Sequence, residues 1–207
     1  MAQLTKRKKG EVTRDRITQA AIRLFVKHGF EKTSFQMIAT KCKMSQQGVM
    51  GHFPTKDHLF QRVLLQIKDK VYAKINDSFD IYDNAYEKII KHFKAQLAIT
   101  SEDPVFMQIY LLFYYKASYM PVYRQAYDET LKEVRKLYMG YLLAGKREGL
   151  FLFEEDVELV AERLHSFFMG SLINYTSSSD YQKKEKRILK LWESTVPVMT
   201  EMPFTAV

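Results

Sequence analysis

Helical periodicity runs through nearly the whole 207-residue chain and constrains the fold more than any other feature. Near the start, Ile17, Ala20, Ala21, Leu24 and Phe25 follow the i, i+3, i+4, i+7 and i+8 spacing of a helix with one apolar stripe. The alternating pattern of β-strands is scarce. Hydrophobic residues make up 46% of the chain, which is ample for a packed core. The sequence therefore predicts an all-α protein of about nine helices.

The first two helices are bounded by local signals. The first is expected to begin near Thr13 and to end before Gly29, because glycine stops helices. Thr33 or Ser34 is expected to cap the second helix, and Gln36 stands at capping-box spacing from Thr33. We expect the second helix to be short, since a turn follows within ten residues.

Residues 42–44 form the expected turn, and Ser45 is expected to cap a third short helix whose inner face carries Val49 and Phe53. Two short helices joined by a three-residue turn are typical of a helix-turn-helix DNA-binding unit. In such units the second of these two helices enters the major groove, which places Gln46 and Gln47 near base edges. Glutamine pairs with adenine in a bidentate manner, although either side chain could instead contact only phosphate.

The basic charge is concentrated at the start of the chain. Residues 1–56 contain twelve Lys or Arg and three acidic residues, a net charge of +9, whereas the whole chain carries +8. The remainder therefore carries −1. This asymmetry predicts a polyanion-binding N-terminal unit, with residues 6–9 as a basic arm along phosphates or in a minor groove. An ordinary solvated tail is the alternative for those four residues.

A long fourth helix is expected to open at Thr55 and Asp57, with an inner stripe that ends at Val71 and Ile75. Some twenty residues at about 1.5 Å each give a rod of roughly 30 Å. We therefore predict two domains, a DNA-binding domain at residues 1–55 and a helical domain at residues 56–207.

The segment from Arg16 to Val63 resembles the N-terminal domain of the tetracycline-repressor (TetR) family of transcriptional regulators. The landmarks that carry the resemblance occur in order and without gaps: Ala20-Ala21, Leu24-Phe25, Gly29-Phe30, Thr33-Ser34, Ile38-Ala39, Ser45, His52-Phe53, Lys56 and Leu59. They cover about a quarter of the chain. The resemblance implies a three-helix DNA-binding domain joined by the fourth helix to a helical domain for ligand binding and dimerisation.

The resemblance also implies which residues touch DNA. Phosphate contacts fall to Thr33, Ser45, His52 and Lys56, and base contacts to the two glutamines. The complete set of expected DNA-binding residues is Thr33, Ser34, Ser45, Gln46, Gln47, Gly48, Met50, His52 and Lys56.

The chain departs from the family pattern within the turn and the third helix. Lys43 stands where the family usually has glycine, and Met50 stands where it usually has a phosphate-contacting tyrosine. Gly48 and Gly51 replace side chains that commonly reach DNA, and each glycine weakens a short helix by roughly 1 kcal/mol relative to alanine. Met50 either packs within the domain or touches a thymine methyl group.

Five further helices are expected after residue 80, at about 82–99, 104–116, 121–147, 155–176 and 182–200. Pro104 and Pro121 suit the first turn of a helix, and Gly149 suits a helix end. No internal repeat or low-complexity linker separates these helices.

Aromatic residues gather between residues 106 and 142, and Tyr119, Tyr123 and Tyr127 are spaced to lie on one helical face. Core packing explains such spacing, but the resemblance implies an effector pocket for a small molecule of apolar or aromatic character. The expected pocket residues are Phe106, Tyr110, Phe113, Tyr114, Tyr123, Tyr127 and Tyr138.

The last two expected helices carry wide apolar stripes. The resemblance implies that they pack as a four-helix bundle between two subunits, so we predict a homodimer with an isologous interface. The expected interface residues are Val160, Leu164, Phe168, Leu172, Ile188, Leu191, Trp192, Thr195 and Val196. In the competing interpretation both stripes close the core of a single protomer.

Other classes of protein fit the sequence less well. Glu162 and His165 form half of a di-iron helical-bundle signature, but the sequence holds no second copy, no phosphate-binding glycine loop and no recognised nucleophile. We therefore expect no catalysis, metal or cofactor. The chain shows no signal peptide or membrane-spanning run, and its single Cys42 suits a reducing compartment, so a cytoplasmic protein is expected.

Taken together, these features predict a dimeric transcriptional regulator that places two recognition helices in successive major grooves of a pseudo-palindromic double-stranded DNA operator. Repression that a bound effector relieves is the favoured mode. The alternative is an architectural DNA-binding protein without an effector.

Overall fold

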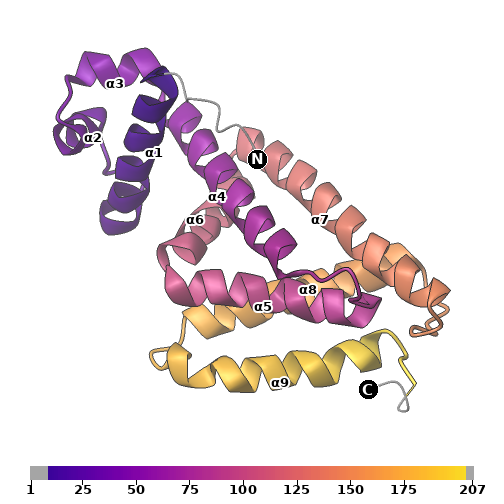
Figure 1. Ribbon diagram of the computed structural model, residues 1–207. Helices are drawn as coiled ribbons and strands as arrows, with labels where there is room; N and C mark the ends of the chain where they lie inside the picture. Colours follow the sequence, from indigo (N-terminus) through magenta and orange to yellow (C-terminus); the bar gives the residue numbers. More distant parts are fainter. Residues whose placement is uncertain (1–8, 204–207) are drawn as a thin grey trace. The chain divides into compact units, whose positions relative to one another are not determined.

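The computed structural model describes residues 9–203, without the side chains of residues 9, 181 and 182, and the described part contains nine helices and no strand (Figure 1). This confirms the all-α prediction. The helices are α1 (Lys9–His28), α2 (Phe35–Cys42), α3 (Gln46–His52), α4 (Lys56–Ser78), α5 (Ala85–Glu102), α6 (Val105–Tyr119), α7 (Pro121–Arg147), α8 (Val157–Thr176) and α9 (Tyr181–Met199). The expected basic arm falls mainly on residues 1–8, which lie outside the described residues.

Contacts between residues divide the chain into two compact units. The first, here called the head, extends to Lys70 and includes Gln108–Tyr110, and the second, here called the body, holds Val71–Met107 and the chain from Leu111 onward. The division falls within α4, whose stripe residues Leu59, Val63, Ile67, Val71 and Ile75 are all buried as expected.

The head is built around three phenylalanine rings. Phe25 of α1, Phe30 of the following turn and Phe60 of α4 lie with ring centroids 5.1 to 5.8 Å apart. Arg62 of α4 pairs with Asp15 of α1 at 3.2 Å. These contacts fix α1 against α4, while the buried Ile38, Ala39 and Cys42 face inward from α2.

Two details of the first helices differ from the sequence-based expectation. α1 begins at Lys9 rather than near Thr13, since helical backbone already includes Glu11 in the first turn, where an acidic side chain is favourable. The cap of α2 is Ser34, whose Oγ accepts a hydrogen bond from the Met37 backbone at 3.2 Å. The capping box expected for Thr33 and Gln36 is therefore not the cap used.

The turn between α2 and α3 requires a left-handed residue, and that residue is Lys43 at φ 51° and ψ 48°. The Lys43 N–H donates to Thr40 and the Met44 N–H to Ala39, which is the double hydrogen bond of a Schellman helix end. Ser45 then caps α3, as predicted, by accepting a bond from the Gly48 N–H at 3.0 Å. A non-glycine residue in this conformation costs about 1 kcal/mol.

In the body, α5, α8 and α9 lie side by side and α7 packs on α5 and α8 (Figure 1). Trp192 of α9 stacks on Phe93 of α5, with centroids 4.3 Å apart, and meets the ring of Phe168 of α8 at 5.5 Å. All three side chains are buried, so the centre of the body is an aromatic core shared by three helices.

Local signals set most helix ends of the body. α5 starts at Ala85 rather than at 82, because Asn84 and Glu87 form a full capping box. Pro121 opens α7 as predicted, and Gly149 follows its end at φ 69°. α9 continues through Pro197, which lies inside the helix range expected from the sequence.

No helix in the described part of the chain is long and apolar enough to cross a bilayer.

Candidate functional site

The outward face of α3 is the centre of the candidate nucleic-acid interface. Gln46, Gln47, Met50 and Gly51 are exposed, whereas Val49 is fully buried beneath them. The structure thus presents both glutamines and the methionine on the surface of the head. Met50, at 41% exposure, is no part of the core, which removes the packing interpretation of this residue.

The two capping serines add polar groups at the starts of α2 and α3. Ser34 and Ser45 are exposed, and each side-chain oxygen accepts a hydrogen bond from the backbone of its own helix. Because the oxygen acts as acceptor, each hydroxyl hydrogen remains available to donate to a phosphate oxygen. His52, the last residue of α3, is partly exposed.

Thr33 does not share this surface. It is 1% exposed, and its hydroxyl oxygen lies 2.8 Å from the carbonyl oxygen of Gly29 and 3.1 Å from that of Leu24. The hydroxyl therefore closes the turn after α1, where it satisfies carbonyl groups at the helix end. The expectation that Thr33 grips phosphate is corrected on this point.

Lys56 has a structural role that the sequence did not reveal. Its Nζ donates to the carbonyl oxygens of Phe30, at 2.8 Å, and Glu31, at 3.1 Å, and lies 4.6 Å from the centroid of the Phe30 ring. An ammonium group has three N–H donors, so one remains after these two bonds. The third donor is free to meet a phosphate, and the first two hold the group in place.

The two glycines of α3 differ in their surroundings. A Cβ at Gly48 would lie 3.2 Å from the Ser45 Oγ and 3.4 Å from the Met44 Cε, so a side chain there would press on the cap. A Cβ at Gly51 would meet nothing within 4 Å. The fold of the head thus favours glycine at position 48 but does not require it at position 51.

The expected pocket residues separate into several places in the structure. Phe113 and Tyr114 of α6 meet Tyr127 of α7, with ring centroids 6.2 and 5.0 Å away, and Phe113 also meets the buried Tyr123. The Lys116 Nζ is buried 4.8 Å from the Tyr123 ring. Phe113 and Tyr123 of this cluster are buried in the body's core, whereas Tyr114 and Tyr127 are half-buried.

The remaining expected pocket residues lie apart from that cluster. Phe106 is buried, Tyr110 belongs to the residues grouped with the head, and Tyr138 lies in a second cluster. Tyr119 is also not on the face of Tyr123, because α6 ends at Tyr119 and Pro121 starts a new helix. The expectation of one continuous face across this break was wrong.

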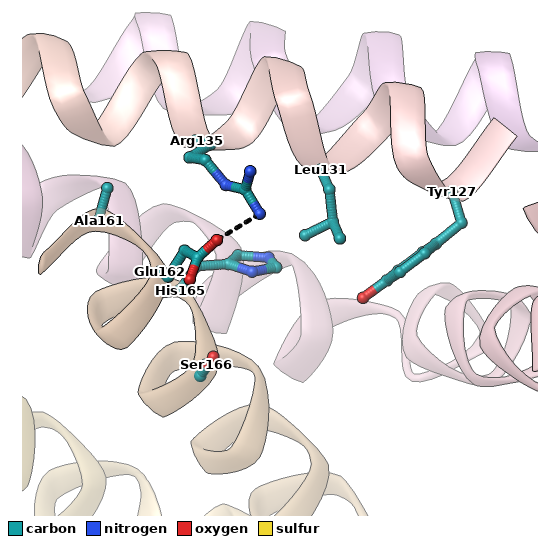
Figure 2. A pocket seen from close by; sticks show the side chains of 7 residues that line it. All are labelled: Tyr127, Leu131, Arg135, Ala161, Glu162, His165 and Ser166. Carbon is teal, nitrogen blue, oxygen red and sulfur yellow. Dashed lines mark ion pairs between the residues drawn. The ribbon is translucent and has the colours of Figure 1, made fainter. Parts of the chain in front are cut away.

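A pocket of about 170 Å³ opens between α7 and α8 (Figure 2). Its walls are Tyr127, Leu131 and Arg135 of α7 and Ala161, Glu162, His165 and Ser166 of α8. Arg135 forms ion pairs with Glu162 at 2.6 Å and with Glu158 at 2.9 Å, and the first of these is drawn in Figure 2. The pocket therefore combines an apolar part with a charged edge.

A buried imidazole lies behind this pocket. The ring of Tyr138 is 6.4 Å from His165, which lines the pocket, and 5.3 Å from His92, which is 2% exposed. The His92 Nε2 is 2.9 Å from the amide of Gln96, and its Nδ1 makes no hydrogen bond to the described residues. Burial lowers the pKa of His92 to about 3, so the ring is neutral.

Most of the expected interface residues are core residues. Val160, Leu164, Phe168, Leu172, Ile188, Trp192 and Val196 are all buried within the protomer. The apolar faces of α8 and α9 pack against α5 and against each other. This agrees with the competing interpretation, in which both faces close the core of a single protomer. Leu191 is 47% exposed and Thr195 is partly exposed, so these two remain on the surface.

A groove of about 920 Å³ runs along the outer side of α8 and α9. Its apolar walls come from Phe167, Ile188 and Leu191, and Gly170 leaves part of α8 bare. The other lining residues are Ser166, Ser171, Asn174, Tyr175, Lys184, Arg187, Lys190 and Ser194.

The metal-enzyme alternative finds no site in the described residues. Glu162 is occupied by Arg135, and His165 faces Tyr138. No three His, Cys, Asp or Glu side chains in the part that the structure describes lie close enough together to hold a metal ion. Cys42 is buried at the end of α2, and burial raises the pKa of its thiol.

The sequence of this chain is similar to a known protein family and to known proteins. The family model for bacterial regulatory proteins of the tetR family matches residues 17–63. The uncharacterized HTH-type transcriptional regulator YerO of Bacillus subtilis is 25% identical over 164 residues, which are 77% of this chain and 56% of YerO. The HTH-type transcriptional repressor KstR2 of Mycolicibacterium smegmatis is 24% identical over 147 residues, 71% of each chain.

The fold also matches that of solved structures. The solved structure of GusR from Salmonella enterica matches with a TM-score of 0.80 at 18% identity, over 95% of this chain and all of that one. The matched residues 17–63 contain α2 and α3 with the exposed glutamines. The chain therefore carries a domain of the tetR family of bacterial regulatory proteins at residues 17–63.

Proposed function

We propose that this regulator is a repressor that binds a pseudo-palindromic operator as a homodimer and leaves it when a small molecule enters the body. The observation that carries the proposal is the surface of α3, where Gln46, Gln47 and Met50 are exposed over a buried Val49. A helix held in this way by its cap and core presents a fixed set of side chains to a major groove.

In this proposal the groups around α3 grip the DNA backbone. Ser34 and Ser45 are exposed and His52 is partly exposed, and Lys56 keeps one N–H to donate to a phosphate while its other two are bound to carbonyl groups. The concentration of positive charge in the first 56 residues supports the same role. Residues 1–55 serve as the DNA-binding domain, and residues 56–207 as the regulatory domain.

The proposed dimer uses the outer side of α8 and α9. The groove there contains exposed Leu191 and the bare backbone of Gly170, which permits close approach of another helix. A second copy related by a two-fold axis would cover this apolar surface and position two recognition helices on one operator.

The effector is proposed to bind between α7 and α8. Tyr127 and Leu131 offer an apolar or aromatic wall, and the ion pair of Arg135 with Glu162 offers polar contacts at the edge (Figure 2). A ligand in this pocket relieves repression only if it binds the DNA-free conformation more tightly than the DNA-bound one.

The direct test is selection of DNA from a random double-stranded pool, followed by sedimentation of the protein with the selected duplex. We expect a pseudo-palindromic sequence and two protomers per duplex. Selection of no preferred sequence, with equal binding to all duplexes, would favour the architectural alternative. Compounds that stabilise the protein thermally are then tested for release of the duplex, with Leu131→Trp, which fills the pocket, as the variant expected to lose the response.

A further inference from the structure

The chemical character of α3 is unusual for a surface that contacts nucleic acid. Its seven residues include no lysine or arginine, its exposed side chains are two amides and one thioether, and the partly exposed His52 stands at its last position. Arg and Lys are the commonest partners of guanine, because guanine offers only acceptors, N7 and O6, in the major groove. The lysine and arginine residues of the head therefore lie outside α3, and base recognition by this helix depends on other groups, chiefly uncharged ones.

These uncharged groups match the two halves of an A·T pair. A glutamine amide offers one donor group and one acceptor, which fit the N7 acceptor and N6 donor of adenine. A thioether side chain has no donor and suits apolar contact with the C5-methyl group of thymine. Adenine and thymine present these features next to one another in the major groove.

The structure assigns different tasks to the two glutamines. The Gln46 Nε2 donates to the Met50 Sδ at 3.9 Å, one helical turn away, and so holds the thioether on the outward face. Gln47 is exposed and makes no hydrogen bond to another described side chain, so its amide is free for a base. Gly51, beside Met50, carries no side chain that would keep the helix away from the groove floor.

We propose that α3 recognises an A·T-rich half-site, in which Gln47 binds the N6 and N7 edge of adenine and Met50, positioned by Gln46, contacts a thymine methyl group. The inference rests on the proposed DNA binding and narrows it to one class of base pair. It adds Met50 as a specificity-determining residue and Gln46 as a positioning residue.

Duplexes in which one base lacks a single methyl group or a single ring nitrogen test the assignment. Half-sites are first selected from a random pool with the full-length protein. In the selected duplex each thymine is replaced in turn by uracil, which removes only the methyl group, and each adenine by 7-deazaadenine, which removes only the N7 acceptor. Affinities are measured by fluorescence anisotropy at fixed salt, because phosphate contacts depend strongly on salt.

The wild-type protein is expected to lose about fourfold in affinity at one uracil, the value for one buried methyl group. It is expected to lose about fivefold or more at one 7-deazaadenine. Met50→Ala should bind thymine and uracil duplexes equally, and Met50→Leu should restore most of the difference. Gln47→Ala should bind adenine and 7-deazaadenine duplexes equally, and Gln46→Ala should reduce only the sensitivity to uracil.

Gln125→Ala, an exposed glutamine on α7, is the matched control and should keep both sensitivities. A selected half-site rich in G·C, or a wild-type protein insensitive to every uracil, would overturn the inference and leave DNA binding intact. Failure to bind any duplex would instead overturn the proposed function. A loss of adenine sensitivity in Gln46→Ala would overturn the separate tasks assigned to the two glutamines.

Discussion

Lys56→Met separates the structural contribution of the ammonium group from its contribution to DNA binding. Methionine keeps most of the apolar stem and removes the charge. The substitution abolishes the bonds to the carbonyl oxygens of Phe30, at 2.8 Å, and Glu31, at 3.1 Å. Hydrogen bonds from a charged donor contribute about 1.5 to 3 kcal/mol each, and the lower end applies because Lys56 is partly exposed.

The expected loss is about 2 to 3 kcal/mol in the free energy of unfolding, since the two bonds share one group. For a chain of this size each 1 kcal/mol lowers the melting temperature by about 2 to 4 °C, so thermal unfolding should shift by roughly 5 to 10 °C. If the third N–H meets a phosphate, the slope of log K against log salt should also fall by about 0.9.

Lys41→Met is the matched control. Lys41 is exposed on α2 and makes no ion pair within the part of the chain that the structure describes, so its removal should change the unfolding free energy by less than about 0.5 kcal/mol. Calorimetry and a salt titration of operator binding provide both measurements. Equal melting temperatures for the two variants would refute the clamp, and an unchanged salt slope in Lys56→Met would refute the phosphate contact.

Three further changes test the packing, the titration and the interface. Gly145→Ala should destabilise the body by about 1 to 3 kcal/mol in urea unfolding, because its Cβ would clash with the buried Phe151 ring, whereas Gly140→Ala on the same helix should stabilise it by up to about 1 kcal/mol. The pKa of His92 is about 3 in the folded chain and about 6.5 in the unfolded chain, so between these pH values only the unfolded chain binds a proton at this residue. The free energy of unfolding should therefore fall by about 2 kcal/mol from pH 7 to pH 5. His92→Gln should remove this part of the dependence of the unfolding free energy on pH. Gly51→Ala should raise the unfolding free energy by about 0.5 to 1 kcal/mol yet weaken operator binding. A variant that is both more stable and tighter in operator binding would contradict a close approach of α3 to the DNA at this position.

The sequence predicted helix types and most helix ends well, because these depend on residues close together in the chain. Ser45 caps α3, Pro121 opens α7 and Gly149 follows its end as expected. Each signal acts through a hydrogen bond or a backbone angle within a few residues. The same locality explains why the helix-turn-helix segment and its two glutamines can be recognised from the order of the residues alone.

The partners of each apolar stripe could not be predicted in this way. Periodicity shows that one face of α8 is apolar, but Phe168 meets Trp192 and Phe93 within the protomer, whereas the family resemblance implies a second subunit at this position. A sequence pattern shows which side of a helix is apolar. It does not show which other helix or subunit covers that side. Phe113 of α6 and Tyr123 and Tyr138 of α7 became core residues for the same reason.

By itself, therefore, the sequence determined the helices, their caps, the basic N-terminal quarter and the helix-turn-helix, all of which arise from neighbouring residues. Only the tertiary structure decided that Thr33 and Lys56 close the same turn, that His92 is buried as a neutral ring, and that a pocket opens beside Arg135. Contacts between residues far apart in the chain depend on how the helices pack, and packing is a property of the whole core.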